Sequence, residues 1–376
     1  MAQFLGTLLV LIALVDIYLT VLYPRSNKGW VSVKMRRLMW LIFRFTANAR
    51  LLKSIGLRTI FNRSILSYSG PTILLVVISV WVLFLLFGFA LIFWPALGSG
   101  IQAGDGPTPT DFMTAFYLSG YILTTLGMGD IVPETGIYRL LAILEAALGF
   151  SVFTLTITYL LAVYSALTQR NIFALRLHYR TNGTGDALEM LARYGQDGDF
   201  AEVREDISGM SLNLLTLLES HHAYPVVHYF RFRESYYALS RLVLIAMDTA
   251  TLLKSALHED RYRALINCTA VAELSGGGRH LLSELAESFL PGQKSCEYQT
   301  PELLLRQRYY RAVDRLRQEG VETVADVEAG ADRYVSLRWQ WEPDVRAIAH
   351  YMAYEWHEID PYERDIERNL LHRVLN

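Results

Sequence analysis

The residues with the clearest chemical possibilities lie in one short stretch, 124–136, which reads TTLGMGDIVPETG. In it, Gly127 and Gly129 alternate with the bulky residues Leu126 and Met128. Glycine adopts backbone angles that other residues avoid, and here these angles let successive carbonyls point the same way. A column of carbonyl oxygens can replace the water shell of a cation. The stretch therefore predicts a cation path lined by backbone oxygens.

The residues just before this stretch predict a short helix that enters a membrane and stops. Residues 111–124 read DFMTAFYLSGYILT, with Asp111 as a plausible N-cap. The apolar run is shorter than the roughly 20 residues that span a bilayer. Irregular backbone at membrane depth is tolerated only where it is buried in protein or lines a water-filled path. We therefore expect a pore helix at 111–124, with its partly negative C-terminal end aimed at the glycine-rich backbone.

Apolar and charged residues are segregated along the 376-residue chain. Hydrophobic residues make up 52% of it and charged residues 19%, but the long apolar runs fall in 1–168 and most of the charge in 169–376. Three runs are long enough to cross a bilayer: Phe4–Tyr23, Thr72–Trp94 and Tyr138–Leu167. The third is longer than needed, so it should tilt or project past the membrane. These features predict an all-α membrane protein.

Loop charges predict the orientation. No Asp or Glu falls between Pro24 and Gly70, and no Lys or Arg falls between Pro95 and Ile137. The first of these loops carries ten basic residues: Arg25, Lys28, Lys34, Arg36, Arg37, Arg44, Arg50, Lys53, Arg58 and Arg63. By the positive-inside rule this loop is cytoplasmic, the N-terminus is outside and the C-terminal half is inside. We expect a multi-pass protein of a cell membrane, the inner membrane of a bacterium, with an amphipathic helix at Val33–Phe45 lying on membrane lipids. Because that basic segment is tethered between two spans, we expect no nucleic-acid partner.

The order of outer helix, pore helix, TxGxGD loop and inner helix resembles the pore module of the tetrameric potassium-channel family. The likeness covers roughly Thr72 to Leu167, and Asp16–Arg37 resembles the extra N-terminal helix of some bacterial members. It implies a homotetramer with K⁺ or Na⁺ ions in the filter and no other metal or cofactor. It also implies an outer mouth at Asp130 and Glu134 and a hinge at Gly149. The selectivity filter that it implies consists of Thr125, Leu126, Gly127, Met128 and Gly129.

The filter departs from the family at two positions. Leu126 stands where valine is usual, and Met128 stands where tyrosine is usual. The tyrosine hydroxyl typically holds the carbonyl ring at a set width, and methionine cannot donate a hydrogen bond. Tyr121 is our candidate for an alternative brace, with Glu145 bracing the pore helix from behind. Three functions stay open: a K⁺-preferring channel, a weakly selective monovalent cation channel, and a non-conducting membrane sensor with a channel-like fold.

One face of the inner helix is a candidate cavity lining and gate. Residues spaced at 100° on this face include Phe150, Phe153, Ile157 and Leu161. A hydrophobic ring there could gate by dewetting. The alternative is that this face packs on a neighbouring helix. We expect Asp16, the charged residue in the first span, to make a structural hydrogen bond with a basic residue of the next loop.

The C-terminal half shows helical periodicity, with breakers that include SGGG at 275–278 and EP at 342–343. We therefore divide the chain into an N-terminal span (1–23), a basic segment (24–71), a pore module (72–168) and a helical cytoplasmic domain (169–376) for assembly or regulation. A cytoplasmic ligand is possible. GTGDAL at 183–188 lacks the last glycine of a dinucleotide fingerprint. No catalytic constellation stands out, so we expect no enzyme. ESHHAYPVVHYF at 219–230 is distinctive, and its histidines are more typical of packing than of a metal site.

Overall fold

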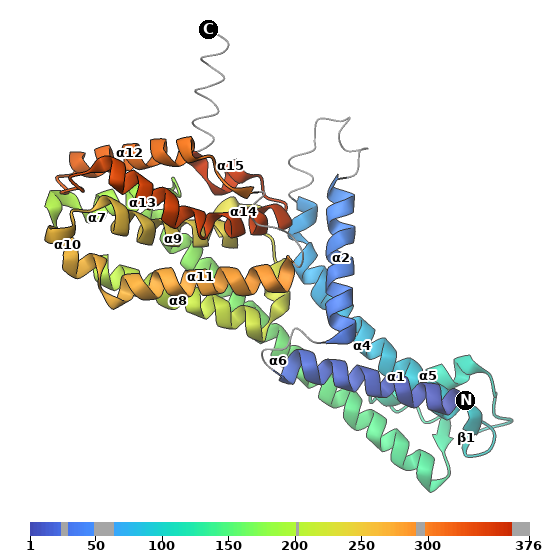
Figure 1. Ribbon diagram of the computed structural model, residues 1–376. Coiled ribbons are helices and arrows are strands. Elements are labelled where there is room, and N and C mark those ends of the chain that lie inside the picture. The colour runs from blue at the N-terminus through green and yellow to red at the C-terminus, as the bar shows by residue number, and fades with distance from the viewer. Residues whose placement is uncertain (24–28, 49–63, 201–202, 291–297, 363–376) are drawn as a thin grey trace. The chain divides into compact units, whose positions relative to one another are not determined.

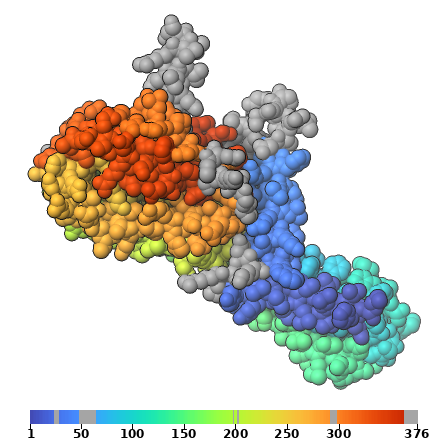
Figure 2. All heavy atoms as spheres, viewed as in Figure 1, coloured from blue at the N-terminus to red at the C-terminus, as the bar shows by residue number. Residues whose placement is uncertain are grey.

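The computed structural model describes residues 1–23, 29–48, 64–200, 203–290 and 298–362. It separates into two compact units (Figures 1 and 2). The membrane unit comprises Met1–Arg58, Tyr68–Ser165 and His222–Phe230. The C-terminal unit comprises Thr59–Ser67, Ala166–His221 and Arg231–Asn376. Residues 24–28 and 49–63 of the predicted basic segment lie outside the described residues.

Three long apolar helices confirm the predicted fold class, an all-helical membrane protein. They are α1 (Ala2–Ile17), continued by the π-helical turn η1 (Tyr18–Leu22), then α4 (Ser69–Phe93) and α6 (Gly136–Arg180). The 45 residues of α6 give a helix of about 67 Å. A bilayer core is about 30 Å thick, so α6 must extend well beyond it. The predicted boundary at 168/169 falls inside this uninterrupted helix.

Short elements connect α4 to α6 at the end where the pore helix lies. After α4 the chain forms the 3₁₀ turn η3 (Trp94–Ala96), β1 (Ile101–Ala103), α5 (Phe112–Leu123) and β2 (Ile131–Pro133). The two strands pair antiparallel, with Ile101 opposite Pro133 and Ala103 opposite Ile131. The helix α5 packs on α4 through a cluster of apolar side chains around Phe87, Phe112 and Phe116. Sequence patterns did not indicate this strand pair, because three residues are too few to show alternation.

The helix α2 (Trp30–Asn48) is amphipathic and begins at a buried carboxylate. Asp16 of α1 accepts hydrogen bonds from the backbone N–H groups of Val31 and Ser32, at 2.9 and 3.2 Å, and from the indole of Trp81 at 2.7 Å. These donors satisfy a buried carboxyl group. The prediction expected a basic residue of the next loop as the partner, whereas these three donors are neutral groups of Val31, Ser32 and Trp81.

The C-terminal unit is a helical assembly around α9 (Leu239–Ala256), in which every residue except Lys254 is buried. It contacts α7 (Ala187–Tyr194), α11 (Thr269–Phe289), α12 (Glu302–Gln318), α13 (Val327–Trp339) and α14 (Glu342–Tyr351). The remaining named elements of this unit are η4 (Gln196–Gly198), α8 (Val203–Ala223), η6 (Ser235–Tyr237), α10 (Glu259–Ile266) and α15 (Trp356–Ile359). A helix buried on all sides is the usual centre of such a fold.

The predicted breaker at SGGG was wrong, because α11 runs through it without interruption. A Cβ on Gly278 would lie 2.1 Å from the sulfur of Met247 in α9, and one on Gly277 would lie 3.2 Å from Leu215 in α8. Glycine in a helix costs about 1 kcal/mol relative to alanine. Here these glycines permit the close approach of neighbouring helices, and tertiary packing overrides the local propensity.

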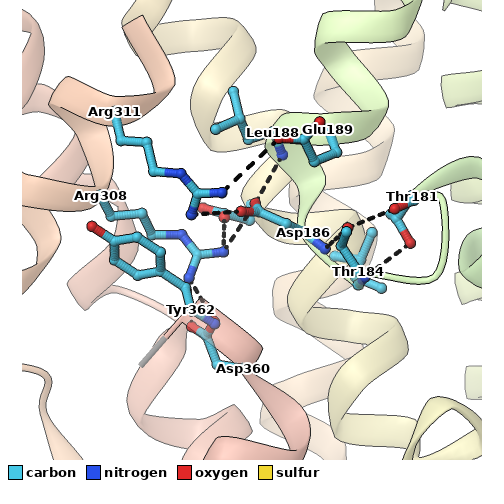
Figure 3. A network of polar contacts seen from close by, with 12 residues as sticks. Thr181, Thr184, Asp186, Leu188, Glu189, Arg308, Arg311, Asp360 and Tyr362 are labelled. Atoms are coloured by element: carbon cyan, nitrogen blue, oxygen red, sulfur yellow. Dashed lines mark hydrogen bonds and ion pairs between the residues drawn. The ribbon is translucent and has the colours of Figure 1, made fainter. Parts of the chain in front are cut away.

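A buried network of charges joins the helices α9, α12 and α13 to Asp186 and Asp360, and Figure 3 shows its part around Arg308. Arg308 of α12 contacts Asp360 at 2.6 Å, Asp248 at 3.0 Å and Asp186 at 3.4 Å. Arg338 of α13 contacts Asp248 at 2.6 Å and Asp360 at 3.1 Å. Burial alone raises the pKa of Asp360, but the two arginines outweigh it and hold that pKa below its ordinary value. The network ties the C-terminal end of the described chain to Asp186, the N-cap of α7.

Candidate functional site

The backbone that follows α5 has an alternating conformation. The helix ends at Leu123. Two of its last carbonyls accept hydrogen bonds from the residues that follow: Ile122 O from Thr125 N at 2.9 Å, and Tyr121 O from Leu126 N at 2.8 Å. From there every second residue has a positive φ, with 56° at Thr125, 63° at Gly127 and 79° at Gly129. A positive φ at a β-branched residue such as Thr125 is unusual and marks a constrained site.

The hydroxyl of Tyr121 fixes the exit of this backbone. It donates to the carbonyl of Ile131, the first residue of β2, and its ring packs edge-on against Tyr117 at 5.3 Å. The residues with alternating φ, 125–129, lie in sequence between Tyr121 and Ile131. The hydrogen bond therefore limits how far its two ends can separate. The side chains of Leu126 and Met128 are 68% and 59% exposed in the single chain.

A buried carboxyl group joins the helices behind the pore helix. Glu145 of α6 is fully buried and accepts a hydrogen bond from the hydroxyl of Ser119 in α5. The same hydroxyl also lies 3.0 Å from the carbonyl of Leu86 in α4. Since a buried polar group without a partner is costly, these bonds select one register of α5 against α4 and α6.

Gly149 lies where α6 touches the end of the pore helix. A Cβ at this position would lie 2.0 Å from the carbonyl oxygen of Leu123. A glycine is therefore required by close packing, and α6 continues as a helix on both sides of it. The predicted hinge at Gly149 stays a prediction.

Next to this contact lies a hollow of 540 Å³, lined by α4, the end of α5, and α6. Its walls include Thr125, Phe150 and Phe153, so two of the predicted cavity residues and the first predicted filter residue line the same space. Further along the same face of α6, Ile157 is 43% and Leu161 68% exposed. This face is thus apolar and uncovered in the single chain.

The predicted mouth residues lie on either side of β2. The backbone carbonyl of Asp130 accepts from Gly104 N at 2.9 Å, and Glu134 N donates to Gly100 O at 2.9 Å. Both acidic side chains are exposed. The strand pair therefore fixes the backbone on both sides of β2, directly after the residues with alternating φ.

Sequence reasoning missed one part of the membrane unit, namely residues 222–230. Pro225–Tyr229 form the buried 3₁₀ turn η5, and Tyr229 and Phe230 contact α2, α4 and α6. The motif at 219–230 stood out by its aromatic and histidine content, but no local pattern indicates a partner 160 positions away. Among the described residues, no group of three His, Cys, Asp or Glu side chains is arranged to hold a metal ion.

Comparison with known proteins finds one family model that matches part of the chain. Residues 72–166 match a model described as "Ion channel", and this segment contains α4 from residue 72 on, α5, the backbone with alternating φ and the first part of α6. The chain is also 25% identical over 256 residues, 68% of its length, to the "Uncharacterized membrane protein YdjJ" of Bacillus subtilis (strain 168), of which the match covers 70%. No solved structure matches the chain. The predicted resemblance to a channel pore is thus supported over residues 72–166, and the filter and the tetramer stay predictions.

Proposed function

We propose that this protein is a K⁺-preferring cation channel that conducts through the backbone carbonyls of residues 125–129. The observation that carries this proposal is the alternation of φ at Thr125, Gly127 and Gly129, directly after a helix that stops partway through the membrane. This conformation is suited to directing successive carbonyls to one side.

The channel would be a homotetramer. One such loop per chain offers carbonyls from one side only, and closed cyclic symmetry is the simplest way to surround an ion. The uncovered apolar face of α6, with Phe150, Phe153, Ile157 and Leu161, would then line the central cavity and form the gate. Asp130 and Glu134 of four chains would make an acidic ring at the outer mouth.

The same assembly gives the other parts of the chain their roles. The N-terminus would lie outside the cell membrane and the C-terminal unit in the cytoplasm, where it would assemble the subunits or respond to a ligand. The exposed apolar residues of α2, among them Leu38, Leu41 and Phe45, would rest on membrane lipids. K⁺ or Na⁺ in the filter would be the bound ion, with no further cofactor.

Recording from purified protein in planar bilayers, with K⁺ on one side and Na⁺ on the other, tests the proposal. A reversal potential near the K⁺ limit is the expected result. Clear current that reverses near zero would show instead a weakly selective monovalent cation channel, which the replacement of tyrosine by Met128 favours. Silence that persists in a still tetrameric variant that opens the gate, with a change at Leu161, would indicate a non-conducting sensor.

A further inference from the structure

We propose that residues His222–Phe230, here called the docking segment, couple the C-terminal unit to the channel gate. This inference rests on the proposed function and names the regulation of the same pore. The segment belongs to the membrane unit although it is flanked on both sides by the C-terminal unit. Its position allows a movement in the C-terminal unit to reach α6 through direct contacts.

The docking segment is fixed first to the beginning of α4. The carbonyl of Tyr229 accepts a hydrogen bond of 2.9 Å from the hydroxyl of Ser69, which is fully buried. The ring of Phe230 lies directly on Gly70, where an added Cβ would lie 2.5 Å from Cγ of the ring. Only glycine leaves room for this ring, so the beginning of α4 is shaped to receive it.

The segment also contacts the amphipathic helix α2. The ring of Tyr229 packs on the buried Trp40 with 5.9 Å between centroids. Aromatic pairs at such distances contribute beyond the area that they bury. The helices α4 and α2 therefore together form the surface on which the docking segment packs.

The contacts that matter for gating are those with α6. Tyr224 packs edge-on against Tyr159 at 5.9 Å, and Phe230 packs edge-on against Tyr164 at 6.0 Å. These two α6 residues lie on either side of Leu161, the innermost of the proposed gate residues. The segment thus holds α6 within one turn of the gate. Tyr159 is buried, whereas Tyr164 is half exposed and Leu161 is 68% exposed, so the segment contacts α6 both on its covered side and next to the exposed gate residue.

Both ends of the docking segment continue into the C-terminal unit without a linker. The helix α8 ends at Ala223, inside the segment. The next residue after the segment, Arg231, is buried, donates to the carbonyls of Met352 and Ala353 at 3.1 and 3.2 Å, and lies 4.2 Å from the ring centre of Tyr354. A rearrangement of either anchoring element would therefore pull on the segment directly, as a bistable coupling element requires.

A double-mutant cycle in the full-length protein tests the coupling. Single-channel recording in symmetric K⁺ gives the closed-to-open ratio for wild type, Phe230→Ala, Gly70→Ala and the double variant. We expect each single change to shift the ratio about five-fold or more, because directly contacting residues couple at this level. In the Phe230→Ala background the methyl group of Gly70→Ala has space, so its further effect should be less than about two-fold. The sense of the shift tells which gate state the docked segment favours.

Two controls separate gating from damage. Gly276→Ala makes the same change on α11, where an added Cβ meets nothing within 4 Å, and should leave the ratio unchanged. Unit conductance and reversal potential should stay at wild-type values in all variants, because Tyr159 and Tyr164 lie about 15 and 22 Å along α6 from Gly149, the residue that contacts the end of α5.

The outcomes are distinct. If all variants conduct with the wild-type closed-to-open ratio, the coupling role is overturned and the proposed channel function stands. Equal, additive effects of Gly70→Ala with and without the Phe230 ring would also overturn it, since the two positions would then act independently. A wild-type protein that never conducts would overturn the proposed function and this inference with it.

Discussion

The hydrogen bond from Tyr121 to the carbonyl of Ile131 leads to a quantitative prediction. Replacing Tyr121 by phenylalanine removes one hydroxyl and leaves the ring packed against Tyr117. Met128 cannot take over the bond, because a thioether is not a donor. The ends of the filter stretch should then separate more easily, and a filter that widens and narrows freely discriminates less between K⁺ and Na⁺.

The magnitude follows from the number of bonds. A hydrogen bond of this kind contributes about 1 kcal/mol, and a tetramer would lose four, or about 4 kcal/mol. Selectivity changes only by the part of this free energy that differs between the filter filled with K⁺ and the filter filled with Na⁺. If that part is about a quarter, the permeability ratio falls about five-fold, since 1.36 kcal/mol corresponds to a factor of ten. A five-fold change corresponds to about 40 mV, given about 59 mV per decade for a single charge.

Bi-ionic reversal potentials of purified Tyr121→Phe and wild-type protein check this value. Tyr138→Phe is the matched control, because its hydroxyl accepts from Gln3 at 3.1 Å, away from the filter stretch. The control should reverse within a few millivolts of wild type. A Tyr121→Phe channel that conducts and reverses where wild type does would refute the idea that this bond sets the width of the filter.

Three further predictions concern close packing and buried charge. Gly149→Ala should weaken the contact with Leu123 and destabilise the assembled pore by about 1–3 kcal/mol, measured as the loss of tetramers on heating in detergent. Gly278→Ala should lower the free energy of unfolding of the C-terminal unit by a similar amount in urea titrations followed by tryptophan fluorescence, whereas Gly276→Ala should raise it slightly, as expected for an exposed helix position. Asp360→Asn should cost about 3–5 kcal/mol at pH 7, because it removes one charged partner from two buried arginines. Since the pKa of Asp360 is depressed on folding, its contribution is fully present above the ordinary carboxyl pKa of about 4 and is lost progressively as the pH falls from there through the lower folded-state pKa. The difference between the variant and wild type should therefore shrink below about pH 4, and a constant difference down to pH 3 would contradict this assignment.

The parts of the fold that were predictable from sequence are those with local causes. The spans followed from the lengths of apolar runs, and the pore helix followed from a short run behind an N-cap. Asp111 accepts from Thr114 N at 3.1 Å, as an N-cap does. The unusual backbone after it could be inferred from Gly127 and Gly129, because glycine is the residue that tolerates positive φ. The third residue with a positive φ, Thr125, could not be inferred in this way, because threonine rarely adopts a positive φ.

The parts that escaped prediction depend on contacts between distant segments. Three consecutive glycines look like a helix end until Met247 is seen packed against one of them. Glu145 is recognisable as a buried carboxyl group, but its partner Ser119 lies 26 positions away. The residues of the docking segment look like a helix end in a polar domain, because nothing near them in sequence encodes Ser69 and Gly70. Such pairs are specified only when the helices have already come together.

The docking segment has a consequence for how the protein is made. The hydrogen bond between Ser69 and Tyr229 joins residues 160 positions apart. A growing chain therefore carries α1, α2, α4 and α6 for some time before the residues that complete the unit have been synthesised. Until then the surfaces of Trp40 and Gly70 that the docking segment covers are left open. A fragment that is meant to contain the whole membrane unit must extend to Phe230, and one cut after the last span removes part of the unit that it was designed to isolate.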